Sequence, residues 1–449
     1  MRSELLEKYA RPVPRYTSYP TAPHFHAGID AACYGRWLAA LPEDEPLSLY
    51  LHIPFCDSLC WFCGCHTKIV ARYAPVTGYL DLVAREVAII AERLGARHPV
   101  GHLHWGGGTP TILRPTDIAA LVALLRDRFA FRPDAEFAVE IDPRTLERDT
   151  VEALAAAGVT RASLGVQDVN PDIQRAINRI QPIAVTAQAA AWLRAAKITA
   201  LNFDLMYGLP GQTVDRVLTT VEAVLDLEPD RIALFGYAHV PWLKTHQRLI
   251  DEATLPDDPA RAAQAEAAAD RLRAAGYRPV GLDHFARSDD AIAKAQPAGR
   301  LHRNFQGYTT DANATLIGFG ASAIGSLPQG YVQNATALHD YRDAIEAGRP
   351  AVVRGIAVSD EDRLRRAVIE RLMCDLTVDL EAVSRRHGRA PETFDDEVAA
   401  LAEMARDGLV AVDGHRVTVP EGARALLRTV CAVFDRHLAS GRGRHSRAV

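Results

Sequence analysis

The sequence lacks the features that would place the protein in a membrane, on a nucleic acid or outside the cell. It has no unbroken apolar run of the ~18 residues that a transmembrane helix needs, and MRSELLEKYARP at its start lacks the apolar stretch of a secretory signal. Lys and Arg number 51 against 56 Asp and Glu, so a net charge of −5 offers no basic excess to anionic polymers or membranes. We therefore expect a cytoplasmic protein that binds neither nucleic acid nor membrane.

Glycine, proline and charged residues are not in excess either. The 449 residues include 30 Gly and 26 Pro, and 48% are hydrophobic and 24% charged. These values are typical of globular proteins and exclude collagen-like, coiled-coil and largely disordered chains. At ~100–200 residues per domain, the length predicts two to four domains with a large buried core.

Cysteine is scarce, and its distribution is uneven. The seven cysteines are an odd number in a long chain, which argues against a disulfide framework. Four of them, Cys56, Cys60, Cys63 and Cys65, lie within ten residues. This clustering indicates a metal or redox site.

Short apolar runs alternate with helical patterns between residues 47 and 237. The runs predict buried strands at 48–53, 100–105, 137–141, 161–166, 200–206 and 231–237. The helices between them are expected at 78–94, 116–129, 150–157, 183–196 and 214–227. This alternation predicts right-handed crossovers between six parallel strands, two units short of a full (β/α) barrel, with the chemistry at the carboxyl ends of the strands.

The sequence before and after this region does not show the same alternation of strands and helices. Residues 1–45 contain RYTSYPTA and many prolines, so we expect an irregular arm over the site, with too few apolar residues to form a core. Residues 46–355 are expected to form the barrel and its extension, with helices at 258–275 and 337–347 and a loop at 299–310. Residues 356–449 predict a mainly helical domain that starts with an N-cap at Ser359. An Asp-Gly turn and a helix from Gly422 give this domain an order resembling a winged helix, for which we expect a structural or lid role.

The cysteines have the spacing CxxxCxxC at Cys56, Cys60 and Cys63, directly after the first expected strand. Thiolates are the preferred ligands of iron–sulfur clusters. Zinc is the alternative, but zinc sites usually take a second ligand pair from elsewhere in the chain, and the sequence has no distant CxxC or HxxxH pair. The spacing therefore favours a cluster.

This arrangement resembles the oxygen-independent coproporphyrinogen III oxidases of the radical S-adenosylmethionine superfamily. The resemblance runs from about residue 10 to residue 440 and is carried by SLYLHIPFCDSLCWFCGC, RYTSYPTA, LHWGGGTPT, GVQD, DLMYGLPGQT, DHFAR and LHRNFQGYTT. It implies an α/β fold, namely an incomplete (β/α)6 TIM-like barrel of the radical SAM type with an N-terminal arm and a mainly helical C-terminal domain.

The resemblance also implies the reaction. Two propionates of coproporphyrinogen III would lose CO₂ and become vinyl groups, giving protoporphyrinogen IX in haem biosynthesis by way of a 5′-deoxyadenosyl radical. Cys56, Cys60 and Cys63 would hold a 4Fe-4S cluster, whose fourth iron stays open for S-adenosylmethionine. Cys65 would be a non-ligating cysteine, although a role as fourth ligand stays open. An electron donor and a terminal acceptor are required, and we expect a monomer.

Contacts with S-adenosylmethionine are implied at positions spread over the barrel. They are Tyr50, Phe62, Gly107, Gly108, Thr109, Glu140, Gln167, Arg179, Asp204, Ala238 and Ile324. The resemblance implies two molecules per chain, with Glu140 at the first and Gln167, Arg179 and Asp204 at the second. From the residues alone, the triple glycine could be a turn, and the two carboxylates could belong to buried ion pairs.

The four propionates of the substrate call for cationic or hydrogen-bonding groups, best supplied by arginine. Candidates in the recognised segments are Arg15, Tyr16, Arg287, His302 and Arg303, each of which could instead be a packing or ion-pairing residue. One functional alternative is a haem-binding, chaperone-like relative without oxidase activity. As such relatives lack both the RYTSYPTA arm and a cysteine at position 65, the sequence favours the oxidase.

Overall fold

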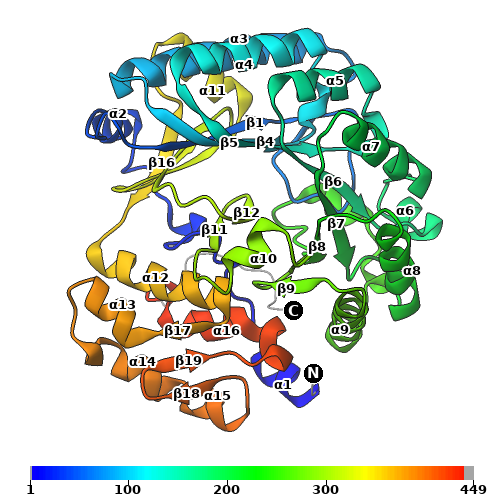
Figure 1. Ribbon diagram of the computed structural model, residues 1–449, viewed down its shortest axis with the longest axis vertical. Helices are drawn as coiled ribbons and strands as arrows, with labels where there is room; N and C mark the ends of the chain where they lie inside the picture. The colour runs from blue at the N-terminus through cyan, green and yellow to red at the C-terminus, as the bar shows by residue number, and fades with distance from the viewer. Residues whose placement is uncertain (1–2, 439–449) are drawn as a thin grey trace.

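The computed structural model describes residues 3–438 and contains a curved twelve-stranded sheet (Figure 1). The outer ends of the arm and of the C-terminal domain, residues 1–2 and 439–449, lie outside the described residues. In order across the sheet, the strands are β16 (Val352–Ala357), β15 (Gly330–Asn334), β14 (Ile324–Leu327), β13 (Thr315–Phe319), β1 (Leu47–Ile53), β4 (Pro99–Gly107), β5 (Ala130–Ile141), β6 (Arg161–Gln167), β7 (Ala200–Tyr207), β8 (Arg231–Gly236), β10 (His284–Ala286) and β9 (Arg278–Val280).

The run from β13 to β8 is parallel and forms the incomplete barrel, which confirms the predicted fold class. All six expected strands are present. The expected number of parallel strands is nevertheless one too low, because β13 pairs parallel to β1. This strand was missed because no helix follows it: the chain turns directly into the antiparallel strands β14 and β15.

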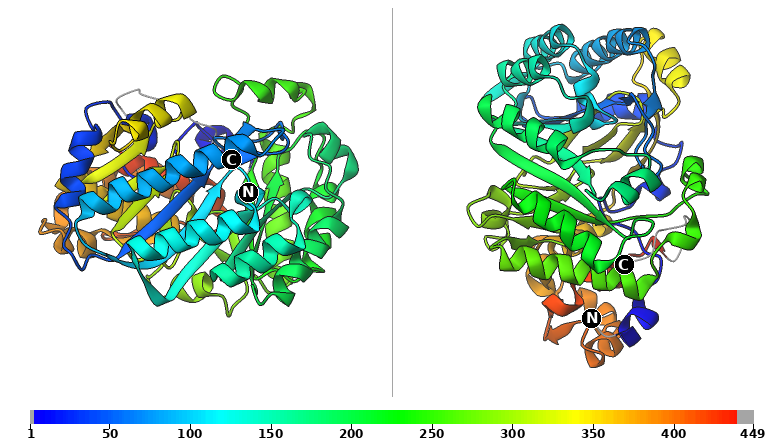
Figure 2. Two further views of the ribbon diagram at one scale, coloured as in Figure 1. Left: turned by 90° about the horizontal axis from the view of Figure 1, so that it is seen from above. Right: turned by 90° about the vertical axis from the view of Figure 1, so that its right-hand side faces the viewer.

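Helices cover the outside of the barrel, as Figures 1 and 2 show. The helices between the parallel strands are α3 (Ala74–Leu94), α4 (Pro115–Arg128), α5 (Arg148–Ala157), α6 (Pro171–Ala176), α7 (Ile183–Ala195) and α8 (Val214–Leu225). α9 (Asp258–Ala274), α10 (Ala291–Ala295) and α11 (Leu338–Glu346) follow later in the chain. Fully buried residues such as Leu51, Trp105 and Phe203 form the main core between the strands and helices. Among residues 3–438, no helix combines the length and apolar character needed to cross a bilayer.

The N-terminal arm is not irregular throughout, and it does contribute to a core. It contains α1 (Ser3–Tyr9) and α2 (Ala31–Ala39), and α1 lies beside the C-terminal elements in Figures 1 and 2. Its buried side chains join one apolar cluster with those of the C-terminal elements: Leu6, Tyr9, Val13, Tyr16 and Tyr19. The prediction was wrong because prolines interrupt the apolar periodicity, and the apolar residues pack against the other end of the chain.

The last part of the chain is mainly helical, as expected. It comprises α12 (Asp360–Asp375), α13 (Leu380–Arg386), α14 (Asp395–Ala400), α15 (Ala402–Arg406) and α16 (Leu427–Cys431), with the small sheet β17 (Thr377–Asp379), β19 (Arg416–Thr418) and β18 (Ala411–Asp413). Ser359 caps α12 in a capping box with Asp362. The Asp-Gly turn joins β18 to β19, with Gly414 at a φ of 57°. The helix expected from Gly422 begins instead as a 3-10 turn, η7 (Glu421–Leu426).

The segment 301–310 is a hairpin rather than a loop. It consists of β11 (His302–Asn304) and β12 (Gly307–Thr309). Tyr308 is buried, and its hydroxyl donates to the carbonyl of Met373 at 2.7 Å. The polar residues of the segment concealed the hairpin, whose few apolar side chains pack in different places: Tyr308 against the C-terminal elements and Phe305 against Tyr331.

Candidate functional site

The four clustered cysteines lie on the loop of residues 54–69, which we call the cysteine loop. Its ends pair as the short strands β2 (Phe55–Cys56) and β3 (Lys68–Ile69) at the carboxyl end of β1. Each sulfur of the CxxxCxxC motif accepts a hydrogen bond. Cys56 Sγ accepts from Thr109 Oγ1 at 3.4 Å, Cys63 Sγ accepts from the Cys65 amide at 3.4 Å, and Cys60 Sγ faces two guanidinium groups. Such donors stabilise thiolates.

The thiols differ in their acidity. Burial raises the pKa of Cys56 to about 12. Hydrogen bonding from the Cys65 thiol lowers the pKa of Cys63 to about 7, despite burial, and the nearby charge of Lys244 acts in the same direction. The pKa of Cys65 is raised well above its usual value, first because its thiol donates to Cys63. The surroundings therefore favour the thiolate at Cys63 and the thiol at Cys65.

The donor set fits an iron–sulfur cluster. Among residues 3–438, no three side chains of Cys, His, Asp or Glu converge so as to hold one metal ion, as the zinc alternative requires. A cluster is larger and takes each thiolate on a different iron, so its ligands need not converge on a point. Cys56, Cys60 and Cys63 supply three thiolates from one loop, with hydrogen-bond donors directed at the sulfurs.

The glycines that end β4 lie against this loop. A Cβ at Gly108 would stand 2.6 Å from the carbonyl oxygen of Phe55 and 3.0 Å from Cys56 Sγ. Gly107 has a φ of 116°, and a Cβ there would meet the His52 ring at 2.5 Å. Only glycine lets the backbone come this close. The chain therefore comes close to the cysteine loop at Gly108, whereas Gly107 lies against His52 of β1 and Gly106 against Glu140 of β5.

Glu140 and Asp204 stand on β5 and β7, enclosed by the barrel. Glu140 accepts from the Gly107 amide at 3.0 Å and from His104 Nε2 at 3.2 Å. Burial acts to raise the pKa of Glu140, but the hydrogen bond and charge of His104 outweigh it and the pKa is lowered. Burial and the charge of Glu140 raise the pKa of Asp204 to about 6, although Asn202 and Ser163 donate to it. Neither carboxylate has an arginine or lysine partner in the described structure. Glu140 pairs with His104 at 3.2 Å, so the buried-ion-pair interpretation applies to Glu140 and not to Asp204.

Arg179 connects the cysteine loop to the next strands. Its guanidinium lies 3.5 Å from Cys60 Sγ, donates to the Gly165 carbonyl at 2.6 Å and pairs with Asp142 at 3.3 Å. Gln167, at the end of β6, has a φ of 68°, which is uncommon for a residue with a side chain. Local strain of this kind is often found at functional sites.

The other implied S-adenosylmethionine positions lie at the same end of the sheet. The hydroxyl of Tyr50, on β1, forms a hydrogen bond with His52 Nδ1 at 3.0 Å. The carbonyls of Phe62 and Ala238 both accept from Gln247 Nε2, at 2.9 and 3.2 Å. Ile324 begins β14, just after the carboxyl end of β13. The fold thus gathers polar groups and exposed backbone from many strands around the cysteine loop.

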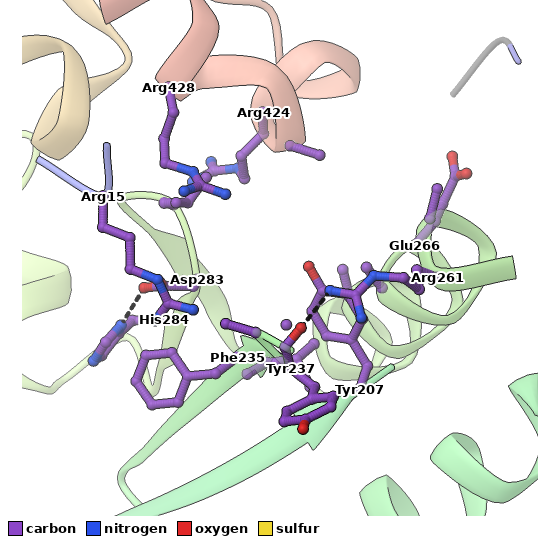
Figure 3. Close-up of a pocket in the computed structure, with 18 of the residues that line it drawn as sticks. Arg15, Tyr207, Phe235, Tyr237, Arg261, Glu266, Asp283, His284, Arg424 and Arg428 are labelled. Carbon is purple, nitrogen blue, oxygen red and sulfur yellow. Dashed lines mark hydrogen bonds and ion pairs between the residues drawn. The ribbon is translucent and has the colours of Figure 1, made fainter. Parts of the chain in front are cut away.

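A cavity of about 1050 Å³ lies beside this region, between the arm, the strands β7, β8 and β10, helix α9 and the C-terminal elements (Figure 3). Cys65 of the cysteine loop is part of its wall. Arginines line it: Arg15, Arg261, Arg273, Arg303, Arg424 and Arg428. So do aromatic side chains: Tyr207, Phe235, Tyr237, Trp242, Phe285 and Phe305. In Figure 3, Arg15, Arg261 and Arg428 reach the cavity from the arm, from α9 and from the C-terminal elements.

Positive charge is concentrated in one part of this cavity. Burial and the neighbouring charge of Arg15 lower the pKa of Arg428 to about 10. The pKa of Asp283 is lowered to about 2 despite burial, by the hydrogen bond from His284 and the charges of Arg303 and Arg15. Arg303 Nη1 lies 4.0 Å from Asp283 Oδ1, and the guanidinium of Arg303 lies over the aromatic ring of Tyr308. One carboxylate thus stands among three arginines, an arrangement that favours an added anion.

Only two of the five substrate candidates reach the cavity, namely Arg15 and Arg303. The hydroxyl of Tyr16 donates to Asp435 at 3.0 Å inside the C-terminal core. His302 pairs with Glu370 at 3.0 Å and does not line the cavity.

Arg287 is a correction to the sequence-based candidates, because it lies at the wrong end of the barrel. Its amide donates to the carbonyl of Asp230 at 2.9 Å, just before β8 begins, whereas the cysteine loop lies at the carboxyl ends of the strands. Arg261, Arg424 and Arg428 were missed. They occur in segments without recognisable motifs, and the residues next to them in the sequence do not distinguish them from surface arginines.

Comparisons with known proteins match two separate parts of the chain to family models. Residues 50–224 match the model of the Radical SAM superfamily, and residues 358–426 match that of the HemN C-terminal domain. The chain is 52% identical to the oxygen-independent coproporphyrinogen III oxidase of Bradyrhizobium diazoefficiens over the full length of both, and 40% identical to that of Escherichia coli over 97% of this chain and 95% of the other. The solved structure of coproporphyrinogen III oxidase (HemN) from Escherichia coli, described as a radical SAM enzyme, superposes with a TM-score of 0.90 at 39% identity, covering 95% of this chain and all of that one.

Proposed function

The chain belongs to the oxygen-independent coproporphyrinogen III oxidases of the radical SAM superfamily, and we propose that the arginine-lined cavity is where it binds its tetrapyrrole. It is an oxidoreductase of haem biosynthesis that converts coproporphyrinogen III without oxygen, using a 4Fe-4S cluster and S-adenosylmethionine. Nothing in the comparisons supports the haem-chaperone alternative.

The cavity is the observation that carries the proposal. Its volume of about 1050 Å³ is at the upper end of the ~300–1,000 Å³ typical of ligand pockets. A tetrapyrrole has a large apolar body with four propionates at its rim. The aromatic side chains suit the body, and arginine forks suit carboxylates. Arg15, Arg303 and Arg428 would hold a propionate near Asp283, while Arg424 lies beside Arg428 and Arg261 faces the cavity from α9 (Figure 3).

The residues around the cysteine loop would hold the cofactors. Cys56, Cys60 and Cys63 would bind the cluster, and Glu140, Asp204, Gln167 and Arg179 would bind S-adenosylmethionine, with two molecules per chain. The bound cluster and S-adenosylmethionine supply a radical able to remove a hydrogen atom from a propionate side chain. The protein's own contribution is to orient the propionate and to keep water and other C–H bonds away.

The wall of the cavity explains how orientation and shielding are achieved together. Cys65 places the cysteine loop at the cavity, so cofactor and substrate would meet there. The arm covers one side, and Arg428 donates to the Val13 carbonyl at 3.3 Å, which ties the arm to the C-terminal elements over the cavity. We also propose that the enzyme works as a monomer in the cytoplasm and takes electrons from a separate donor, with a separate terminal acceptor.

Anaerobic product analysis tests the proposal. Protein with a reconstituted cluster is incubated with S-adenosylmethionine, a reductant, an added terminal electron acceptor and coproporphyrinogen III, and the porphyrins are separated after oxidation. We expect protoporphyrin to appear together with two CO₂ per molecule. Tight binding of haem without any vinyl product would favour the chaperone alternative instead.

A further inference from the structure

Gln247 connects the cysteine loop to the end of the barrel. It lies in η4 (Thr245–Leu249), on the segment that follows β8, and is only 1% exposed. Its Oε1 accepts from the Val240 amide at 2.6 Å, and its Nε2 donates to the carbonyls of Phe62 and Ala238 at 2.9 and 3.2 Å. A primary amide has two donor hydrogens and one acceptor oxygen. Both hydrogens of Gln247 are therefore used to hold two separate parts of the backbone together.

The two carbonyls belong to positions of special interest. Phe62 lies between Cys60 and Cys63, and Ala238 follows β8 and lines the cavity. The amide of Gln247 thus fixes the cysteine loop relative to the end of β8. Because the side chain is buried, water cannot replace these bonds if they are lost, and the two carbonyls would be left without this donor.

Two neighbours of Gln247 support the same part of the loop. Lys244 Nζ donates to the Cys65 carbonyl and a ring nitrogen of His246 bonds to the Cys63 carbonyl, both at 2.8 Å. The segment 238–250 therefore contacts the backbone of Phe62, Cys63 and Cys65 through three side chains. Lys244 and His246 are more accessible than Gln247, which makes Gln247 the buried anchor of the three.

We propose that Gln247 is a positioning residue for S-adenosylmethionine, acting by holding the backbone of Phe62 and Ala238 in place. The inference rests on the proposed function and on the S-adenosylmethionine contacts that the resemblance implies at Phe62 and Ala238. Gln247 itself does not touch the cofactor. It sets the separation between the loop that carries the cluster ligands and the strand end at which the cofactor is held.

The test uses cluster-loaded, full-length protein and two substitutions. Gln247→Ala removes all three bonds. Gln247→Glu keeps the acceptor for the Val240 amide but directs a carboxylate oxygen at the two carbonyls, so it removes only the donor function. Gln296→Ala is the matched control, since the amide of Gln296 also donates to a backbone carbonyl, that of Cys374 at 2.7 Å, far along the chain from the cysteine loop. The readouts are iron content, equilibrium binding of S-adenosylmethionine and the change that it produces in the electron paramagnetic resonance spectrum of the reduced cluster.

We expect both Gln247 variants to keep their iron, to bind S-adenosylmethionine about tenfold more weakly and to show a reduced spectral change. Gln296→Ala should behave like the wild type. Unchanged affinity in Gln247→Glu at full iron content would overturn the proposal, as would equal weakening in the control. Loss of iron from both Gln247 variants would assign the residue to the cluster rather than to S-adenosylmethionine. If the wild-type protein bound no S-adenosylmethionine, the proposed function itself would fail.

Discussion

The guanidinium of Arg179 lies 3.5 Å from the sulfur of Cys60. Arg144 reaches the same sulfur from the other side, at 3.4 Å, and both arginines pair with Asp142. Cys60 is thus the cysteine of the motif that is surrounded by fixed positive charge.

The first prediction concerns the cluster ligands. Replacing Cys56, Cys60 or Cys63 by Ser should each abolish the brown chromophore and the activity, because three thiolates are needed to hold the cluster. Cys65→Ser should retain iron and sulfide. Cys65 is part of the cavity wall, so the substitution can still lower the activity. Iron and sulfide analysis of the four purified variants provides the measurement. An equal loss in all four would show Cys65 to be a ligand.

The second prediction concerns Asp204. Equilibrium binding to cluster-loaded protein should find two S-adenosylmethionine molecules per chain, and Asp204→Asn should weaken binding about tenfold, because an amide has half the acceptor capacity of a carboxylate. Since the pKa of Asp204 is raised to about 6, its ionised form is lost as pH falls through 6. Wild-type binding should therefore weaken below pH 6, and binding to Asp204→Asn should change less over that range. A single binding site, or the same pH dependence in both proteins, would contradict this.

The third prediction concerns the arm and the cavity. Deletion of residues 1–25 is not a clean test, because it would also remove Leu6, Tyr9 and Tyr16 from the C-terminal core. Arg15→Ala leaves that core intact and should lower kcat/KM for coproporphyrinogen III by about 10- to 150-fold, the range expected for a charged hydrogen bond. Arg287→Ala is the control, because Arg287 lies at the opposite end of the barrel. Equal activities of the two variants would remove Arg15 from the substrate site.

The fourth prediction concerns stability and pH. Glu86 is 1% exposed and accepts from the Gly320 amide, Asn334 and Tyr341, yet burial raises its pKa to about 7. The folded protein therefore binds a proton more tightly than the unfolded chain, so stability falls as pH rises from about 4.5 to 7, by up to about 3 kcal/mol. Glu86→Gln should remove this contribution. Anaerobic melting curves between pH 5 and 8 should show a smaller fall of Tm in the variant than in the wild type.

Much of the barrel could be predicted because its strands are buried on both sides. The six apolar runs and the helices between them appear within a few residues of where the pattern put them, since continuous apolar letters and 3.6-residue periodicity record burial directly. The CxxxCxxC motif was equally visible because its three cysteines are neighbours in the sequence. β13 escaped because it has no helix after it, and the arm escaped because its partner residues in the C-terminal elements lie about 345 positions away or more.

The site could be predicted only where it follows short motifs. Gly107 and Gly108 could be noted from their repetition, but the close approach of Gly107 to His52 and of Gly108 to Cys56 is a property of the folded backbone. Arg261, Arg424 and Arg428 line one cavity only through the packing of α9, η7 and α16 around it. Gln247 gave no signal, because its role depends on two carbonyls that any residue would supply. Residues defined by tertiary neighbours leave no mark in local sequence.

The shared core of the arm and the C-terminal elements has a consequence for biosynthesis. Residues 6–19 leave the ribosome first, but their partners extend to Phe434. The part of the cavity wall formed by Arg424 and Arg428 cannot be in place until almost the whole chain has been made. Until then, the barrel and its cysteine loop remain open on that side. A nascent chain that ends before Arg424 therefore lacks this part of the cavity wall.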